Sequence, residues 1–322
     1  MVFHKAVFVL LVLIFCSVKT EVIHAEETSR TFSVTNGTVK VHFIDPFTRS
    51  EQKKIMYWLA QNAAAVTTLY GKFPIDDAVV TVKKAQGASE PVPWGQVLRE
   101  RIEGVNFHVN PRFSRADFMR DWTAAHEFSH LFIPFPGNKD SWFSEGLATY
   151  LQNTLRVRAS MLSEQQGWQK LYEGLRRGQR DTKMQDMPLA ELSPKMWDSR
   201  SYQRVYWSGV CYFLRAEIDL FDATGGEHSL DSVLRDFNRC CRFKKKAWSA
   251  LALAQRFDQI SGTKVFTRNL RDILKTYTLP EIEPLFAELG LRVNRRRIAV
   301  VADNNVLRQR IMRGALSPVV AK

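Results

Sequence analysis

Two histidines separated by a turn of helix, with a glutamate after the first, are the residues of this chain whose types and spacing most clearly suggest chemistry. They lie in the segment His126-Glu127-Phe128-Ser129-His130, an H-E-x-x-H pattern. On a helix, residues i and i+4 lie on one face, so both imidazoles can reach one metal ion. Glu127 can then act as the general base beside a zinc-activated water. Three fixed positions can match by chance, so the surrounding sequence has to support the pattern.

The sequence around the pattern predicts one helix from about Arg115 to Phe132. Ser114 and Asp117 have the spacing of a capping box at its start, and Pro134 and Pro136 end it. Apolar residues surround this helix nearly completely, which is typical of a helix buried between two layers. Buried histidines require polar partners, so a metal ion with hydrogen-bond acceptors behind it explains the pair better than chance does.

A third metal ligand is predicted in the following segment, Ser141 to Tyr150, a helix with Asp140 or Ser141 as its N-cap. Glu145 lies in its first turn, with fourteen residues between it and His130, which leaves room for a loop and a reversal of direction. Gly146 permits close approach of the two helices, although ordinary helix packing also explains it. The alternative for Glu145 is a favourable charge at the positive end of the helix dipole.

The predicted ligand set favours a catalytic zinc site over a structural one. Two histidines and one glutamate leave the fourth tetrahedral position open for water. The competing pattern H-E-x-x-H-x-x-G-x-x-H is excluded, because Ile133 and Pro136 occupy the positions where it requires glycine and histidine.

Several segments resemble the catalytic domain of the glycyl aminopeptidase family of gluzincin zinc metallopeptidases. The segment Trp142-Phe143-Ser144-Glu145-Gly146-Leu147-Ala148-Thr149-Tyr150 follows HEFSH as it does in that family. Tyr206-Trp207-Ser208-Gly209 is similar to the family's tyrosine-glycine helix. Thr224-Gly225-Gly226 and Ser229-Leu230-Asp231-Ser232-Val233-Leu234 are similar to its connection into the next helix. The resemblance runs from about Asp121 to Val293.

The resemblance also implies roles for individual residues. It implies one zinc ion held by His126, His130 and Glu145, with Glu127 as the general base and Tyr206 as the donor to the oxyanion. A phenol can hydrogen-bond the tetrahedral oxyanion of the reaction. Tyr202 lies one helical turn before Tyr206 and is the alternative donor.

Two departures from the family limit what the resemblance implies. The family typically carries a PDZ module after the catalytic domain, and we expect none here because little sequence remains. An aminopeptidase also needs a carboxylate near the substrate amine, and no Gly-x-x-Glu motif precedes the zinc helix. The strand-like segment Gly104 to Asn110 takes that place and is expected to be the edge along which a peptide lies. His108 in this strand is either functional or an ordinary surface or hydrogen-bonded residue, and the substrate-binding residues remain unknown.

The amino terminus predicts export. Lys5 precedes the apolar run from Ala6 to Val18, and Ile23-His24-Ala25 forms a small-residue cleavage site. The run is short for a membrane span, although an uncleaved anchor is the alternative. We expect a periplasmic or extracellular protein with no transmembrane span in the mature chain.

Three cysteines remain after such a cleavage: Cys211, Cys240 and Cys241. Adjacent cysteines rarely bridge each other without strain, so a bond between Cys211 and one of the other two is expected. No C-x-x-C spacing indicates a cysteine zinc site.

The mature chain is strongly basic. The whole sequence has a formal net charge of +13, and removing Lys5, Lys19 and Glu21 with the signal segment leaves +12. Clusters such as Lys244-Lys245-Lys246 and Arg295-Arg296-Arg297 are either a solvated face or a binding surface for an anionic cell-envelope partner. Binding to nucleic acid has no motif support and conflicts with export.

The predicted fold class is α+β, with the thermolysin-like two-lobed architecture of the family. A small mixed β-sheet lobe and a mainly helical lobe form one catalytic unit, and the zinc helix lies between them. The expected ranges are 1–25 for the signal peptide, 26–114 for the first lobe, 115–292 for the zinc-binding helical lobe and 293–322 for a basic tail. Strands are expected at Thr31 to Val34, Val39 to Ile44, Ala78 to Lys83 and Gly104 to Asn110.

These observations predict an exported zinc metallopeptidase that hydrolyses peptide bonds. Whether it acts as an aminopeptidase or an endopeptidase is left open by the sequence. One alternative is a noncatalytic zinc-binding envelope adaptor on a peptidase scaffold, and another is a zinc amidase acting on cell-wall peptides. The presence of Glu127 and Tyr206 beside the ligands argues against the adaptor.

Overall fold

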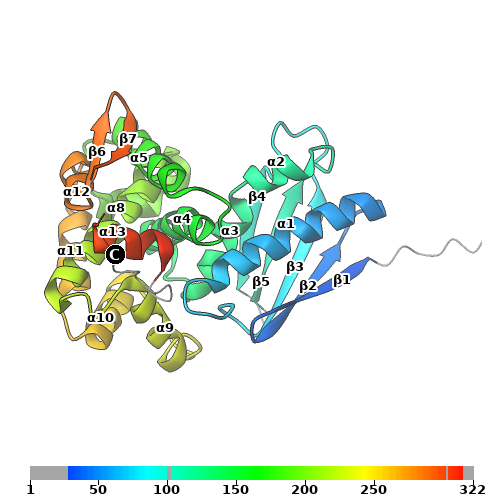
Figure 1. Cartoon of the computed structure of the whole chain (residues 1–322), viewed down its shortest axis with the longest axis horizontal. Helices are drawn as coiled ribbons and strands as arrows, with labels where there is room; N and C mark the ends of the chain where they lie inside the picture. The colour runs from blue at the N-terminus through cyan, green and yellow to red at the C-terminus, as the bar shows by residue number, and fades with distance from the viewer. Residues whose placement is uncertain (1–27, 100–102, 302–303, 315–322) are drawn as a thin grey trace, which may run out of the picture.

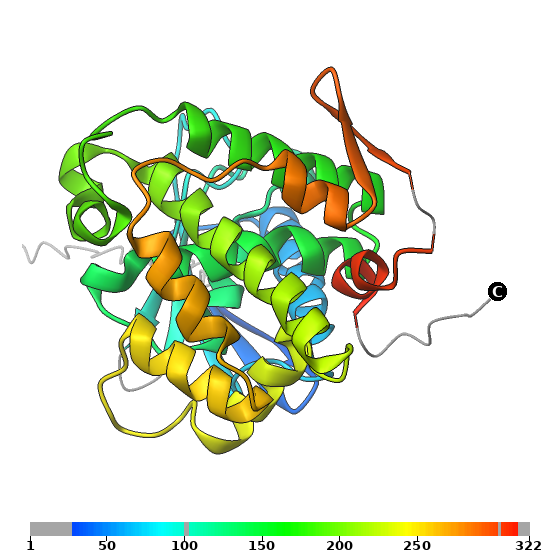
Figure 2. The ribbon, with the colours of Figure 1, turned by 90° about the vertical axis from the view of Figure 1, so that its left-hand side faces the viewer.

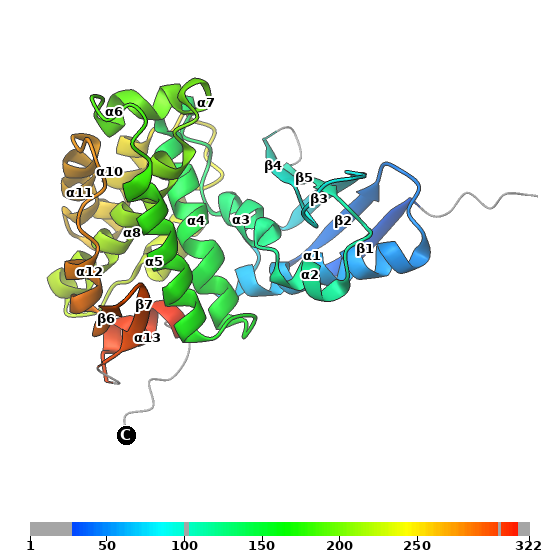
Figure 3. The ribbon, with the colours of Figure 1, turned by 90° about the horizontal axis from the view of Figure 1, so that it is seen from above.

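A β-sheet and a bundle of helices lie on either side of a short buried helix in the computed structural model, which describes residues 28–99, 103–301 and 304–314 (Figure 1). Seen from above, helix α3 (Thr123–Ser129) lies between the sheet and the long helices (Figure 3). The predicted α+β class with two lobes is therefore confirmed. No helix within the described ranges has the length and apolar character needed to cross a bilayer. The predicted signal segment, 1–25, lies outside them.

The sheet has five strands in the order β1-β2-β3-β5-β4. The pairs β2–β3 and β3–β5 are parallel, and the two outer pairs are antiparallel. Alternate residues such as Val39, Val41 and Phe43 face the core, which is the period-2 pattern of a strand with one buried face. The strands are β1 (Ser29–Val34), β2 (Gly37–Phe43), β3 (Asp77–Lys84), β4 (Trp94–Arg99) and β5 (Glu103–Val109).

The edge of the sheet near the site is β4, a strand that the sequence did not predict. The expectation that Gly104 to Asn110 forms this edge is wrong, because β5 pairs with β3 on one side and with β4 on the other. Strand β4 was missed because it is partly exposed throughout and contains a glycine, so its alternation of apolar and polar residues is weak.

One long helix covers the sheet. Helix α1 (Arg49–Thr67) begins with a capping box between Thr48 and Glu51 and buries Ile55, Trp58 and Leu59. The Trp58 ring packs edge-on against Phe107 of β5, with ring centroids 5.1 Å apart. This apolar layer contacts α3, where the rings of Phe107 and Phe128 lie 6.1 Å apart.

The helix predicted from Arg115 to Phe132 is broken into three pieces. Helix α2 (Arg115–Arg120) begins with the predicted capping box of Ser114 and Asp117. The backbone then turns extended at Asp121, whose carboxylate accepts the backbone N–H of Thr123 and so starts α3 as a separate helix. The turn η1 (His130–Phe132) follows α3 directly. Every residue of α3 is buried, as predicted.

The second lobe is helical and is built around α4 and α8 (Figure 2). The sequence predicts helices in this lobe near Ser141 to Tyr150, Ser163 to Arg177, Gln203 to Leu220, Leu230 to Cys241, Ala247 to Ile260 and Val265 to Lys275, and all of them are present. Three short helices, α6, α7 and α12, were not predicted. Its helices are α4 (Ser141–Arg158), α5 (Glu164–Arg180), α6 (Leu189–Leu192), α7 (Met196–Ser199), α8 (Tyr202–Thr224), α9 (Leu230–Cys240), α10 (Ala250–Ser261), α11 (Val265–Leu274) and α12 (Glu283–Glu288).

The last described residues pack onto this lobe. A hairpin of β6 (Leu291–Asn294) and β7 (Arg297–Val300) is followed by α13 (Val306–Arg313). The side chain of Arg158 in α4 donates two hydrogen bonds to the carbonyl of Ile311 in α13. The boundary predicted after residue 292 falls inside the hairpin.

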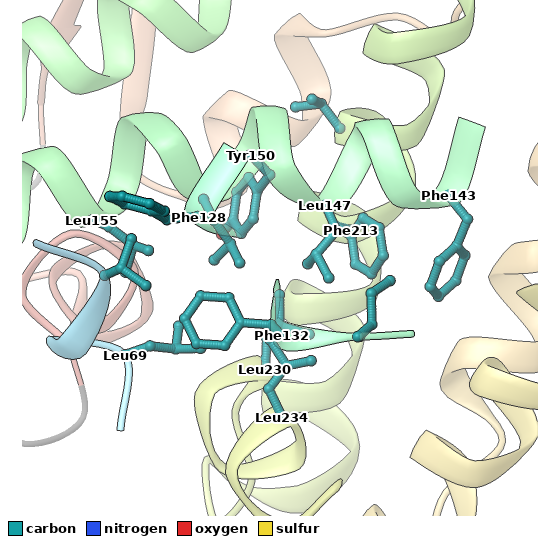
Figure 4. Packing of buried hydrophobic residues seen from close by; sticks show 14 of the residues in the cluster. Leu69, Phe128, Phe132, Phe143, Leu147, Tyr150, Leu155, Phe213, Leu230 and Leu234 are labelled. Atoms are coloured by element: carbon teal, nitrogen blue, oxygen red, sulfur yellow. The ribbon is translucent and has the colours of Figure 1, made fainter. Parts of the chain in front are cut away.

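Part of the side of α4 that faces α3 is apolar. Phe128 and Phe132 point toward Leu147 and Tyr150 of α4 (Figure 4). All four side chains are at most 1% exposed, so the two elements form one continuous core. Burial of this kind contributes about 1.5–3 kcal/mol for each large apolar side chain.

Two glycines bring α4 and α8 into backbone contact. A Cβ added to Gly146 would lie 2.3 Å from the Cα of Gly209, and one added to Gly209 would lie 2.1 Å from the carbonyl oxygen of Trp142. Only glycine allows this approach. The contact matters for the site, because Glu145 and Tyr206 lie on these two helices.

The predicted pairing of Cys211 is wrong. Cys240 and Cys241 form a disulfide with each other, and Cys211 is a free, buried residue of α8. Helix α9 ends at Cys240, and the backbone leaves the helical conformation at Cys241. The irregular backbone at this helix end lets the two neighbouring side chains meet.

We predict that Gly146→Ala lowers the free energy of unfolding by about 1–3 kcal/mol, because the added methyl group would overlap the backbone of Gly209 in α8. Thermal unfolding followed by circular dichroism measures the change. Ala223→Ser, at an exposed position of α8, is the control and should leave the midpoint unchanged. Equal midpoints for Gly146→Ala and wild type would contradict the close contact.

Candidate metal centre and active site

The three predicted ligands converge on one point. Nε2 of His126 lies 3.1 Å from Oε2 of Glu145 and 3.2 Å from Nε2 of His130. Nε2 of His130 lies 3.5 Å from the same carboxylate oxygen. The residues come from α3, η1 and α4, and Glu145 occupies the second turn of α4 rather than the first. The sequence spacing therefore identified a real cluster, and within the described residues it is the group able to hold a metal ion.

Each imidazole is held in place by a hydrogen bond at Nδ1, the ring nitrogen that faces away from the other ligands. Nδ1 of His126 lies 2.8 Å from Oε1 of Gln152, and Nδ1 of His130 lies 3.0 Å from the hydroxyl of Ser144. When Nδ1–H donates to these oxygens, Nε2 presents its lone pair to the centre of the cluster. Gln152 and Ser144 are both residues of α4, so this one helix supplies a ligand and orients the other two.

Two arginines fix the end of the segment that carries His126 and His130. Arg99 of β4 donates to the carbonyl of His130 at 2.6 Å, and Arg242 donates to the carbonyl of Leu131 at 2.9 Å. Both guanidinium groups also pair with Glu103 in β5. Carbonyls at the end of a helix lack intrahelical partners, and cations stabilise them. These contacts tie His130 to the sheet.

The edge strand β4 positions Glu127. The backbone N–H of Val97 donates a hydrogen bond to the Glu127 carboxylate. A Cβ added to Gly95 would lie 2.8 Å from Cγ of Glu127 and 2.8 Å from Cγ2 of Thr123. The glycine therefore leaves the space that this carboxylate occupies, and the strand sets its direction.

Tyr206 reaches the same cluster from α8. Its hydroxyl hydrogen-bonds the Glu145 carboxylate, and its ring stacks beside the His126 ring with centroids 6.2 Å apart. Tyr202 instead donates to the carbonyl of Trp197 at 3.4 Å. Tyr202 and Tyr206 were both candidates from the sequence, and the structure places Tyr206 beside the three predicted metal ligands.

Burial and charge shape the protonation of these groups. Burial raises the pKa of Glu127, an effect that the neighbouring histidines partly oppose. Burial also acts to raise the pKa of Glu145, but the His130 and His126 imidazoles outweigh it and hold that pKa well below its usual range. Burial and the nearby Glu145 carboxylate raise the pKa of Tyr206, which stays a protonated hydrogen-bond donor.

These groups line an open cleft of about 500 Å³ beside β4. Glu127 and Glu145 are the carboxylates among its described lining residues, and the wall also includes Trp94, Phe135 and Trp197. His108 is not part of this lining. Its ring instead packs against Trp94 across the β4–β5 pair at 4.6 Å, so the structure places it as a cross-strand packing residue.

Four supporting residues were missed from the sequence: Gln152, Ser144, Gly95 and Val97. Gln152 follows Glu145 by seven residues, a spacing that returns to the same helix face, and this signal could have identified it. The two strand residues belong to an element that was itself not predicted.

The residues present fit a zinc ion. Two imidazole nitrogens and one carboxylate oxygen are the donor set of zinc hydrolases, and all three lie within 4.8 Å of one another. Glutamine and serine fix the imidazole tautomers, which is the usual outer-shell support of such ligands. Without a cation, the Nε2 lone pairs and the carboxylate oxygen would repel one another.

Comparison with known families agrees with the predicted resemblance. Residues 136–216 match the family described as M61 glycyl aminopeptidase. The match contains Glu145 and Tyr206, and it confirms the resemblance that the segment from Trp142 and the tyrosine-glycine helix predicted. A search of curated proteins returns no match.

Solved structures of several other proteins share the fold. An aminopeptidase N family protein from Idiomarina loihiensis is similar over 83% of this chain and 50% of its own, with 14% identity and a TM-score of 0.66. Native yeast LTA4 hydrolase is similar over 81% of this chain and 41% of its own, with 13% identity and a TM-score of 0.54. The M1 zinc metallopeptidase from Deinococcus radiodurans is similar over 79% and 52%, with 15% identity and a TM-score of 0.50. The chain therefore spans about half the length of such proteins, and these likenesses concern the fold.

We predict that Gln152→Leu weakens zinc binding by about 10–100-fold, because His126 loses the acceptor that fixes its tautomer. Competition between the protein and a chromogenic zinc chelator measures the affinity. Gln61→Leu, a partly buried glutamine of α1 away from the cluster, is the matched control. Unchanged affinity in Gln152→Leu would show that this hydrogen bond does not support metal binding.

Proposed function

We propose that this chain is a zinc-dependent metallopeptidase that hydrolyses peptide bonds in the cleft beside β4. The observation that carries the proposal is the convergence of His126, His130 and Glu145, with Glu127 and Tyr206 lining the same cleft. The family match and the shared fold support it.

Each catalytic step has a residue suited to it. A zinc ion held by the three ligands would supply Lewis acidity toward a water molecule and a scissile carbonyl. Glu127, held by the Val97 N–H and raised in pKa by burial, accepts the proton of the attacking water and passes it to the leaving amine. The Tyr206 hydroxyl donates a hydrogen bond to the oxyanion that forms on the carbonyl. Its contact with Glu145 keeps it close to that position.

The free edge of β4 is suited to hold the peptide backbone. In the described sheet β4 pairs with β5 alone, so its outer N–H and C=O groups are available to an extended peptide. Strand addition of this kind provides affinity through main-chain hydrogen bonds. The peptide would then run past Glu127, which the same strand positions.

We favour cleavage within a chain over removal of an amino-terminal residue. An aminopeptidase requires a carboxylate for the substrate ammonium group. Among the described residues that line the cleft, the carboxylates are Glu127 and Glu145, and both have other roles. Arg99 of β4 also lines the cleft, and its positive charge disfavours a substrate ammonium group there.

An enzyme explains the site better than a noncatalytic adaptor does. An adaptor would need the zinc ligands alone, whereas here an edge strand with a specifically placed glycine holds Glu127 in position. Tyr206 is likewise brought to the cluster by a glycine contact between helices. An amidase acting on cell-wall peptides would use the same groups, and product analysis distinguishes it.

We also propose that the protein acts outside the cytoplasm. The charged and apolar pattern of residues 1–25 supports export, and the Cys240–Cys241 disulfide agrees with an oxidising compartment. Lys244, Lys245 and Lys246 lie exposed directly after the disulfide and would suit an anionic envelope surface.

We predict that Glu127→Gln lowers peptide hydrolysis by about 10²–10⁴-fold, because the amide cannot accept the proton of water. The variant should retain one zinc per chain, measured by metal analysis, and chelation should abolish cleavage by the wild type. Glu191→Gln, at an exposed position, is the control. Cleavage of a diverse peptide library by Glu127→Gln at the wild-type rate would contradict the proposal.

We predict that Tyr206→Phe lowers kcat by about 10²–10³-fold, the effect of removing one donor to an oxyanion. Tyr202→Phe, one turn earlier on α8, removes the same hydroxyl from a position outside the metal cluster and is the matched comparison. Steady-state kinetics with one cleavable peptide measure both. A larger loss in Tyr202→Phe would assign the role to Tyr202.

A further inference from the structure

A second cavity, of about 380 Å³, adjoins the cleft of the metal cluster. The two share Tyr206 and Trp197 in their walls. A substrate held at the metal cluster can therefore extend into this cavity, which we call the basic pocket. Its charged lining residues are Arg156, Lys170, Glu173 and Arg177.

The charge in this pocket is positive. Three cationic side chains face one carboxylate, that of Glu173, which already accepts a hydrogen bond from Gln169 at 2.9 Å. Lys170 makes no ion pair or hydrogen bond with any described residue, and it is exposed. Partial burial lowers the pKa of Lys170, and the neighbouring Arg156 and Arg177 guanidinium groups lower it further, whereas the Glu173 carboxylate opposes this effect.

Arg156 adds a buried charge that makes no direct contact with a carboxylate in the part of the chain that the structure describes. It is 1% exposed, and its Nη2 donates to the carbonyls of Met119 and Arg120 at 3.2 and 2.9 Å. Its Nε has no hydrogen-bond partner among the described residues. Asp121 is the acidic group that acts on Arg156 through its charge, and burial raises the pKa of Asp121 to about 6. A buried guanidinium without a close anion creates a positive potential in the space beside it.

The rest of the lining suits an organic group that carries the anion. Trp122, Trp197 and Trp207 provide aromatic walls, and Gln152, Asn153 and Gln203 provide amides. Arg177 lies over the Trp207 ring, 5.3 Å from its centroid, and donates to Gln203 at 3.3 Å, which holds its guanidinium at the rim. Inorganic ions do not need aromatic walls, whereas a peptide side chain or chain end does use them.

We propose that the basic pocket binds a carboxylate of the peptide substrate, so that the enzyme prefers peptides that present a carboxylate at this position. The inference rests on the proposed peptidase function and adds a substrate class to it. The same chemistry can come from an aspartate or glutamate side chain or from the carboxyl terminus of the peptide. Because the basic pocket adjoins the cleft at one place, the preference applies to a carboxylate at one position relative to the scissile bond.

The test compares three forms of one cleavable peptide: an acidic side chain with an amidated end, a neutral sequence with a free carboxyl end, and a neutral sequence with an amidated end. We expect kcat/KM for one or both carboxylate forms to exceed that of the fully neutral form by about tenfold at low salt. The excess should fall as ionic strength rises, because salt screens exposed charges. Comparison of the two carboxylate forms shows whether the pocket binds an acidic side chain or the carboxyl terminus of the peptide.

The variants are Lys170→Glu, which reverses a charge in the pocket, and Lys53→Glu, which reverses an exposed charge on α1 outside both cavities. The ratio of kcat/KM between carboxylate and neutral forms should collapse toward one in Lys170→Glu, recover in Lys170→Arg, and match wild type in Lys53→Glu. Equal cleavage of all three peptides by wild type, or a ratio that Lys170→Glu leaves unchanged, would overturn the inference. If the wild type cleaved none of these three peptides and no library peptide, the proposed peptidase function would instead be refuted.

Discussion

Two imidazole nitrogens and one carboxylate oxygen meet where α3, η1 and α4 adjoin, beside the apolar core that joins α3 to α4. Burying such groups without partners is costly, so the fold provides one for each. Gln152 and Ser144 accept from the imidazoles, and the Glu145 carboxylate stands between them. A cation at this point would replace mutual repulsion by coordination, and the arrangement of the surrounding helices follows from that requirement.

The helices meet this requirement through close backbone contacts. Gly146 and Gly209 allow α4 to lie directly against α8, and these glycines neighbour Glu145 and follow Tyr206 by less than one turn. The contact that packs the second lobe thus also sets the separation between a ligand and the oxyanion donor. On the other side, β4 holds Glu127 through Val97 and fixes the end of the metal-binding segment through Arg99. Each lobe contributes one part of the site, and α3 and η1 carry the two histidines between the lobes.

The features that depended on local spacing were predictable from the sequence. The pair at i and i+4, the later glutamate and the capping box at Ser114 all depend on residues close in the chain. The structure brings the three side chains together and contains the capping box, although Glu145 lies in the second turn of α4 rather than the first. The break at Asp121 was missed because one backbone residue in an extended conformation leaves the apolar pattern of the segment unchanged. Strand β4 was missed because an exposed edge strand has little alternation to detect. The disulfide was wrongly paired because local backbone geometry at the end of α9, rather than general expectation for adjacent cysteines, decides that bond.

The central claim is that the three groups hold a catalytic zinc ion while Glu127 stays free to act as a base. Anomalous diffraction at the zinc absorption edge, from crystals of the zinc-loaded wild-type protein, tests it most directly. The account predicts one anomalous peak per chain, bonded to Nε2 of His126, Nε2 of His130 and a carboxylate oxygen of Glu145, with Glu127 outside bonding distance. A zinc ion bound through Glu127, or located away from these three residues, would contradict it.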